Sequence, residues 1–271
     1  MEGAESVAPG QQGARVAPGP ARLRRVVLAA LAVFVFACAV YLPSMRNAFV
    51  WDDHALVENP DVRTLNWVNI QRMFTTNYWE VTDVTGGMYR PLTMLSLYTD
   101  YQLYGPEPAG FHLTNTLFNA AVCTLVFAVL LALFGSLTTA LMTALFFAAF
   151  PMHVENVAWV WGRTDLIATM FMLLSLWCYA LWRSRGTTIA LAGVIVLFAA
   201  ALLSKETAVV LPAVVLVLEL ISHDRARGRS ERRNGIVLTV LMFVMALLYL
   251  ALRKHILGVA VVYFAPFTHG V

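Results

Sequence analysis

The sequence predicts an all-α integral membrane protein, because its composition is too apolar for a soluble fold and apolar segments of near-spanning length recur along it. Hydrophobic residues make up 59% of the 271 residues and charged residues only 13%, and the mean hydropathy is +0.69. Soluble domains are about 25% charged, so this chain lacks the charge to cover a water-exposed surface. These values exclude a cytosolic enzyme, a nucleic-acid-binding protein and a chain that is disordered throughout.

The N-terminal region combines a polar tail with a first apolar segment. Residues 1–21 are mainly Gly, Ala, Pro, Gln and Ser; such a segment cannot bury a core, and we expect a disordered tail. Three arginines, at positions 22, 24 and 25, then precede an apolar run over residues 26–42. This run is longer than the apolar part of a signal peptide and has no small-residue cleavage site. It therefore predicts an uncleaved first transmembrane helix.

Six further apolar segments follow, which together with the first predict about seven transmembrane helices. Because a span needs about 20 residues, several of these segments must borrow residues from their flanks. Residues 22–271 are therefore expected to form one polytopic membrane domain. The six segments lie at about 111–134, 137–150, 166–182, 187–203, 207–221 and 236–252.

A long polar stretch, residues 43–110, separates the first and second predicted spans. It carries eight acidic residues and no segment apolar enough to cross a membrane. Within it, residues 90–104 have apolar side chains at helical spacing, which favours a helix lying on the membrane interface.

Arginine placement sets the expected orientation of the spans, because basic residues concentrate on the cytoplasmic side. With the N-terminus inside, most arginines fall on that side, including those of the arginine-rich segment 222–235. The acidic stretch 43–110 then forms a long first outer loop. Arg253 and Lys254 depart from the rule, because the seventh span places them outside.

Four polar clusters interrupt the apolar chain, and all of them fall at the outer ends of predicted spans. Each alone has an ordinary explanation, such as a solvated loop, an interfacial anchor or a local ion pair. Ionisable groups near membrane depth are rare and tend to mark functional sites, so four clusters on one side predict a functional site there. The clusters are Trp51–His54; Tyr89–Pro91 with His112 and Asn115; Pro151–Glu155 with Gly162–Asp165; and Ser204–Thr207.

The residue types in these clusters suit group transfer from a lipid-linked phosphate donor. A carboxylate near the membrane surface can act as a general base on a hydroxyl, so Asp52 and Asp53 are the predicted catalytic residues. Arginine holds phosphate by bidentate contacts and lysine as a point charge. Arg90, Arg163 and Lys205 are therefore the predicted ligands of the donor phosphate. Fixed cations in a dry site also stabilise the charge on a leaving phosphate.

The acidic pair leaves two questions open. Successive side chains of an extended chain point in opposite directions, so one carboxylate is expected to face the site and the other to hold the loop. Asp53 is the narrow choice for the base. Paired carboxylates can bind Mg²⁺ or Mn²⁺ through their oxygens, or act as a base without metal, so the metal requirement stays open.

Seven short motifs carry these polar residues in a fixed order along residues 45–220. They are Asn47–Asp53, Glu58–Val62, Tyr89–Thr93, Gly110–Asn115, Phe150–Glu155, Gly162–Leu166 and Leu203–Thr207. In order and approximate spacing they resemble the transmembrane and tetratricopeptide-repeat O-mannosyltransferases. The resemblance implies the GT-C glycosyltransferase fold, a polyprenyl- or dolichyl-phosphate sugar donor, and a catalytic acidic pair in the first outer loop that Asp52 and Asp53 match.

The resemblance also assigns supporting roles, and the chain departs from the family pattern at two points. The supporting polar residues are His112, His153, Glu155, Asp165 and Glu206. The family pattern has His where this chain has Phe150, and the sequence contains no 34-residue helical repeat. We therefore expect a truncated GT-C-like membrane part without tetratricopeptide repeats, which is either a truncated member, a fragment of a longer gene or a membrane-only relative.

The predicted function is transfer of a mannose-like sugar from the lipid-phosphate donor to a protein Ser or Thr hydroxyl on the outer or luminal face. The alternatives are a lipid or glycan acceptor in the same fold, a transporter-like protein, and a non-catalytic membrane scaffold. Arginine far outnumbers lysine and no Asn-x-Ser/Thr sequon occurs. These features favour a bacterial inner membrane over the endoplasmic reticulum membrane.

Overall fold

The computed structural model describes residues 19–58, 60–77, 88–221 and 229–258, and all its regular elements within these ranges are helices. The all-α prediction is thereby confirmed. The predicted disordered tail lies almost entirely outside the described residues, as does the first half of the arginine-rich segment 222–235.

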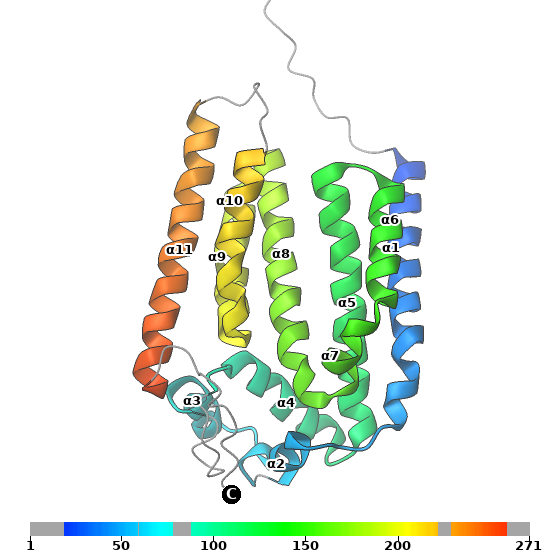
Figure 1. Ribbon diagram of the computed structural model, residues 1–271, viewed down its shortest axis with the longest axis vertical. Coiled ribbons are helices and arrows are strands. Elements are labelled where there is room, and N and C mark those ends of the chain that lie inside the picture. The colour runs from blue at the N-terminus through cyan, green and yellow to red at the C-terminus, as the bar shows by residue number, and fades with distance from the viewer. Residues whose placement is uncertain (1–18, 59, 78–87, 222–228, 259–271) are drawn as a thin grey trace, which may run out of the picture.

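Each of the seven predicted apolar segments forms a helix, and these helices stand side by side (Figure 1). Four regions of the described chain are long and apolar enough to cross a membrane, and the bent pair α6–α7, with 54° between its helices, adds a fifth. Helix α9 is apolar but shorter, so the count of seven spans is not confirmed. The helices are α1 (Pro20–Tyr41), α5 (Pro108–Phe134), α6 (Leu137–Ala149), α8 (Arg163–Arg185), α9 (Thr188–Ser204), α10 (Leu211–Ile221) and α11 (Arg229–Leu257).

Short elements from three connections between the long helices gather at one end of these helices (Figure 1). This end corresponds to the predicted outer side. The elements are η1 (Leu42–Arg46), α2 (Asp52–Glu58), η2 (Pro60–Arg63), α3 (Trp67–Thr75), α4 (Pro91–Tyr104), η4 (Pro151–His153), α7 (Val154–Ala158), η5 (Val160–Gly162) and η6 (Glu206–Val210).

Helix α4 confirms the helix predicted over residues 90–104, and it lies more deeply than an interfacial helix would. It packs against α5, α8 and α9, and Thr93, Leu97 and Asp100 on it are buried. The hydroxyl of Thr93 donates to the carbonyl of Ser204 at the end of α9, with 3.0 Å between the oxygens. Helix α4 therefore closes the outer end of the helix layer.

Small residues allow the helices on one side of the molecule to approach closely. Ala140, Ala144 and Ala148 recur every fourth residue of α6 and are buried against α1 and α5, where Ala37 and Ala120 lie. Such small-residue faces are typical of helix packing in membranes, where close van der Waals contact replaces the hydrophobic driving force.

A polar network joins the helices on the other side, near their inner ends. The hydroxyl of Tyr179 donates to Glu219 across 2.6 Å, and Arg183 lies 3.2 Å from the second oxygen of the same carboxylate. A Cβ at Gly235 of α11 would collide with that carboxylate. Glycine therefore lets α11 approach the charged side chain of α10.

Candidate active site

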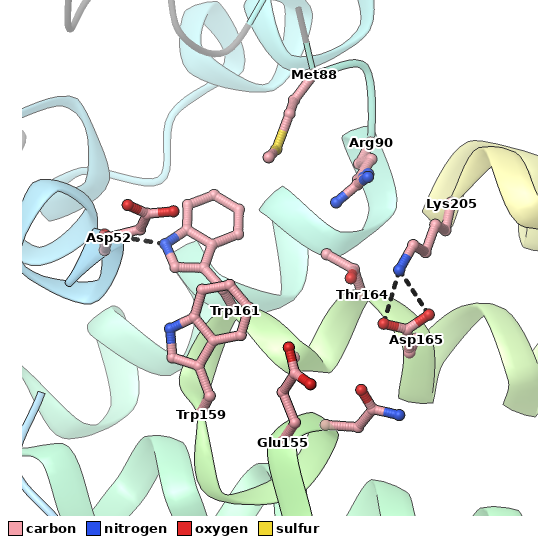
Figure 2. A pocket seen from close by; sticks show the side chains of 11 residues that line it. Asp52, Met88, Arg90, Glu155, Trp159, Trp161, Thr164, Asp165 and Lys205 are labelled. Carbon is pink, nitrogen blue, oxygen red and sulfur yellow. Dashed lines mark hydrogen bonds and ion pairs between the residues drawn. The ribbon is translucent and has the colours of Figure 1, made fainter. Parts of the chain in front are cut away.

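Five of the predicted site residues line one small cavity at the outer end, about 140 Å³ in volume. Asp52 comes from α2, Glu155 from α7, Asp165 from the first turn of α8, Arg90 from the residue before α4, and Lys205 from the residue after α9. Figure 2 shows these side chains around a common space. Residues distant in the sequence are thus brought together, as the convergence of the clusters predicted.

A strained turn before α2 sends the two adjacent acids in different directions. Trp51 has a positive φ of 48°, which is costly for a bulky residue and characteristic of functional sites. After it, Asp52 is exposed and lines the cavity, whereas Asp53 is fully buried. The indole nitrogen of Trp161 donates to the backbone carbonyl of Asp52 across 2.9 Å (Figure 2), which ties α2 to η5.

The buried acid, Asp53, holds this loop in place. Its Oδ2 accepts a hydrogen bond from the backbone N–H of Val50 at 3.1 Å. Burial raises the pKa of Asp53 to about 6, although the backbone N–H groups of Val50, Trp161 and Val160 act in the opposite direction. The charge of Asp52 adds a smaller upward contribution to the pKa. One acid therefore faces the cavity and the other holds the loop, and the accessible one is Asp52, not Asp53.

Arg90 is fixed by a bidentate ion pair. Its Nη2 and Nε donate to the two oxygens of Glu206 at 2.8 and 3.2 Å. Burial raises the pKa of Glu206, but the hydrogen bond and charge of Arg90 and the charge of Arg253 outweigh it, and the net pKa lies below the ordinary value. Glu206 thus remains ionised beside the cavity and orients the guanidinium group.

Arg253 departs from the arginine rule, and its burial gives a physical reason for this departure. Its side chain is buried near the end of α11, with 3% of its surface exposed. Its charge acts on Glu206. Arg253 is therefore part of the charged cluster at this end, not a solvent-facing topology signal.

Lys205 forms the second ion pair of the cavity. Its Nζ donates to both oxygens of Asp165, at 2.6 and 2.7 Å (Figure 2). The lysine side chain is 18% exposed and that of Asp165 34%, so both can be reached from the cavity.

The wall between the two ion pairs and α2 is built from the segment that contains Glu155. Glu155 is exposed and, like Asp52, forms no ion pair or side-chain hydrogen bond with another described residue. Gly162 lies against this wall, since a Cβ there would come within 2.6 Å of the backbone of Glu155 and Asn156. Within the described part of the chain, the cavity thus presents two unpaired carboxylates opposite two paired cations.

Arg163 does not line the cavity. It is fully buried, and its guanidinium group bonds to Asp100 and Asn115, at 2.5 and 2.6 Å, and to the carbonyl of Phe111 at 2.9 Å. Its charge is therefore engaged by buried partners between α4, α5 and α8.

The two predicted supporting histidines also lie away from the cavity. His112 is completely buried in α5. The ring of His153 packs on those of Phe147 and Phe150, with centroid distances of 4.3 and 6.1 Å. Phe150, the departure from the family pattern, thus contributes an apolar neighbour to His153.

Trp159, Trp161 and Asn156 line the cavity, and sequence reasoning did not single them out. Tryptophan beside a membrane segment is usually an interfacial anchor, so the presence of tryptophan did not indicate a functional site. Within the described ranges no three His, Cys, Asp or Glu side chains are grouped closely enough to hold a metal ion. The Mg²⁺ or Mn²⁺ prediction stays a prediction.

Comparison with known proteins identifies relatives that cover most of the chain. The family model described as dolichyl-phosphate-mannose-protein mannosyltransferase matches residues 101–263. Protein O-mannosyl-transferase Tmtc2 of Drosophila melanogaster is 33% identical over 78% of this chain and 24% of its own length. Protein O-mannosyl-transferase TMTC1 of Homo sapiens is 32% identical over 73% of this chain and 24% of its own.

A third relative, protein O-mannosyl-transferase TMTC3 of Mus musculus, is 29% identical over 67% of this chain and 20% of its own length. The chain thus spans about a quarter of the length of these relatives or less, and no solved structure matches it.

Together with the candidate spans, these matches make it an integral membrane protein. The motif resemblance is confirmed: the chain belongs to the protein O-mannosyl-transferase family, among the dolichyl-phosphate-mannose-protein mannosyltransferases.

Proposed function

We propose that this chain forms the donor and catalytic part of a membrane mannosyltransferase that acts on protein Ser or Thr hydroxyls at the outer or luminal face. The observation that carries the proposal is the arrangement of Asp52 opposite Arg90 and Lys205 around one cavity at the outer end. The names of the relatives support mannose as the sugar and protein as the acceptor. A polyprenyl- or dolichyl-phosphate donor fits the cations.

The reaction requires one bond to form and one to break at the anomeric carbon of the sugar. The acceptor hydroxyl oxygen attacks that carbon, and the bond from the carbon to the donor phosphate oxygen breaks with its electron pair passing to the phosphate. Asp52 takes the hydroxyl proton as general base. Arg90 and Lys205 stabilise the negative charge that develops on the leaving phosphate.

Asp52 suits the role of base better than Asp53. A base must be within reach of the proton that it removes, and Asp52 is exposed and lines the cavity while Asp53 is buried and does not line it. Glu155 is the second carboxylate that faces the cavity without a partner among the described residues, so it is the alternative base.

One feature of the structure and one feature of the relatives bear on the other predicted functions. The charged cavity residues lie together at one end of the helices, whereas transporters place ionisable groups near the midplane. The relatives are named as transferases to protein, which disfavours a lipid or glycan acceptor. Whether the membrane is bacterial or that of the endoplasmic reticulum stays a prediction.

The test measures mannose transfer in membranes that contain the full chain. Dolichyl-phosphate mannose with a labelled sugar is added, and the label in acid-precipitated protein is counted separately from the label in extracted lipid. Asp52→Asn is expected to lower transfer to protein roughly 10²- to 10⁴-fold, the usual loss for a general base. Glu58→Gln is the matched control, because Glu58 lies on α2 with its side chain 76% exposed and away from the cavity.

The outcomes separate the alternatives. Parent-like transfer by Asp52→Asn, with loss in Glu155→Gln, moves the base to Glu155. Label found only in lipid supports the lipid acceptor. Parent-like transfer by both variants overturns the catalytic role of the cavity.

A further inference from the structure

The two cations of the cavity are both neutralised by carboxylates, but the two pairs differ in construction. Arg90 is held by a two-point contact with Glu206, and Glu206 itself does not line the cavity. Lys205 is held by Asp165, and in this pair both partners line the cavity. A phosphate that enters therefore meets Asp165 directly, whereas Glu206 stays behind its arginine.

The pair formed by Lys205 and Asp165 is also the easier one to open. Lysine is a point charge on a flexible stem, whereas the arginine fork is rigid. Asp165 lies in the first turn of α8, where the helix macrodipole stabilises a negative charge. Asp165 can therefore release Lys205 to a phosphate while the N-terminus of α8 continues to stabilise its negative charge.

The carboxylate of Asp165 on the cavity wall treats donor and product unequally. The lipid-phosphate sugar donor is a phosphodiester with one negative charge. The lipid phosphate left after transfer is a monoester, whose charge at neutral pH is about −1.5 to −2. Repulsion scales with the product of the charges, so the product is repelled more strongly than the donor.

We propose that Asp165 is a specificity-determining residue that favours the singly charged donor over the doubly charged product and so promotes product release. The proposal rests on the proposed function, since it assigns the cavity a phosphate ligand. It gives Asp165 a role that opposes phosphate binding, in contrast to Glu206, which positions Arg90 for binding.

The test is a binding measurement with two soluble probes, farnesyl phosphate as the monoester and farnesyl methyl phosphate as the diester. Binding to the purified full chain in detergent is followed by calorimetry at pH 7.5. Asp165→Asn is expected to tighten the binding of both probes. Repulsion from Asp165 costs the doubly charged monoester about twice the binding free energy that it costs the singly charged diester. Because affinity depends exponentially on free energy, the fold-increase in affinity for the monoester should approach the square of that for the diester, for example about 10-fold against about 3-fold.

Four further variants show whether the effect belongs to this pair. Asp165→Glu keeps the charge and should bind as the parent does, and Glu58→Gln, a surface acid away from the cavity, should have no effect. Glu206→Gln should weaken both probes, because Arg90 loses the partner that orients it. The double variant Lys205→Met with Asp165→Asn should lack the increase in affinity that Asp165→Asn shows alone, since the two residues act on the same phosphate.

Three results would overturn the proposal: unchanged or weaker binding by Asp165→Asn, equal gains for the two probes, and no binding of either probe by parent and variant. The transfer assay is read separately. If Asp165→Asn tightens monoester binding more than diester binding in a chain that transfers no mannose, the selectivity of Asp165 is supported and the transferase activity is rejected. Active transfer with no change in probe binding rejects the role of Asp165 alone.

Discussion

Arg163, the residue before the cavity-lining Thr164, forms a buried ion pair with Asp100, with 2.5 Å between Nη2 and Oδ2 and with side chains that are 0% and 5% exposed. The pair joins α8 to α4, and the bonds from Arg163 to Asn115 and Phe111 add α5. Three helices that carry or support cavity residues are therefore held by one guanidinium group.

Removing one partner of this pair is expected to destabilise the protein strongly, because it leaves an uncompensated buried charge. We expect Asp100→Ala and Arg163→Met each to cost about 3–5 kcal/mol, measured by unfolding in detergent. Arg163→Lys should also be destabilising, because lysine lacks the planar fork that reaches several acceptors at once. Arg185→Ala is the control, as Arg185 is exposed at the other end of α8. Equal stability of Arg163→Met and the control would contradict this role.

Asp53 is expected to make stability fall as the pH rises from about 4.5 to 6.5. Its pKa is about 6 in the folded protein against an ordinary value of 3.8, so the folded state binds more protons in this range. Glu206, whose pKa is lowered, loses its contribution only under more acidic conditions. The thermal midpoint of Asp53→Asn should therefore depend less on pH than that of the parent or of Glu58→Gln. Parallel pH profiles for Asp53→Asn and the parent would reject the raised pKa.

Gly162→Ala is expected to disturb the cavity wall through a single methyl group. Gly162 has a φ of −57°, which alanine adopts freely, so the cost comes from contact alone. The new Cβ would lie 2.6 Å from the carbonyl oxygen of Glu155 and the Cα of Asn156, which are backbone atoms that cannot simply rotate away. We expect mannose transfer to fall at least about 10-fold.

Gly19→Ala is the matched control for this substitution, because no atom lies within 4 Å of a Cβ at that position. The transfer assay and the thermal midpoint are measured for both variants. Full transfer by Gly162→Ala would show that the wall can move without loss of function.

The orientation of the chain can be tested by labelling single introduced cysteines with a membrane-impermeant reagent. A cysteine in place of exposed Glu58 should react from the outer side, and one in place of exposed Arg185 should react only after the membrane is opened. The native Cys38, Cys123 and Cys178 are replaced by Ala or Ser as background. The reverse pattern would place the cavity on the cytoplasmic side and contradict the proposed acceptor.

Several features of this protein follow from the sequence alone. Apolar composition and arginine placement predict the membrane location and the polar outer end, because the transfer of residues between water and lipid is nearly additive along the chain. The same patterns predict the helices and their order, including the helix at 90–104. Short helices such as α9 mark the limit of the span prediction, since length and hydropathy do not decide whether a segment of 17 residues crosses the membrane.

The tertiary structure decided which polar side chains act together. Arg90 and Glu206 are 116 residues apart and Arg163 and Asn115 are 48 residues apart, so no local pattern predicts their pairing. Residue type made Arg163 a candidate phosphate ligand, but packing between three helices buries it. The positive φ of Trp51, which its residue type does not favour, precedes Asp52, which lines the cavity, and Asp53, which is buried. Side-chain direction at such a turn depends on long-range contacts, among them the bond from Trp161 to Asp52.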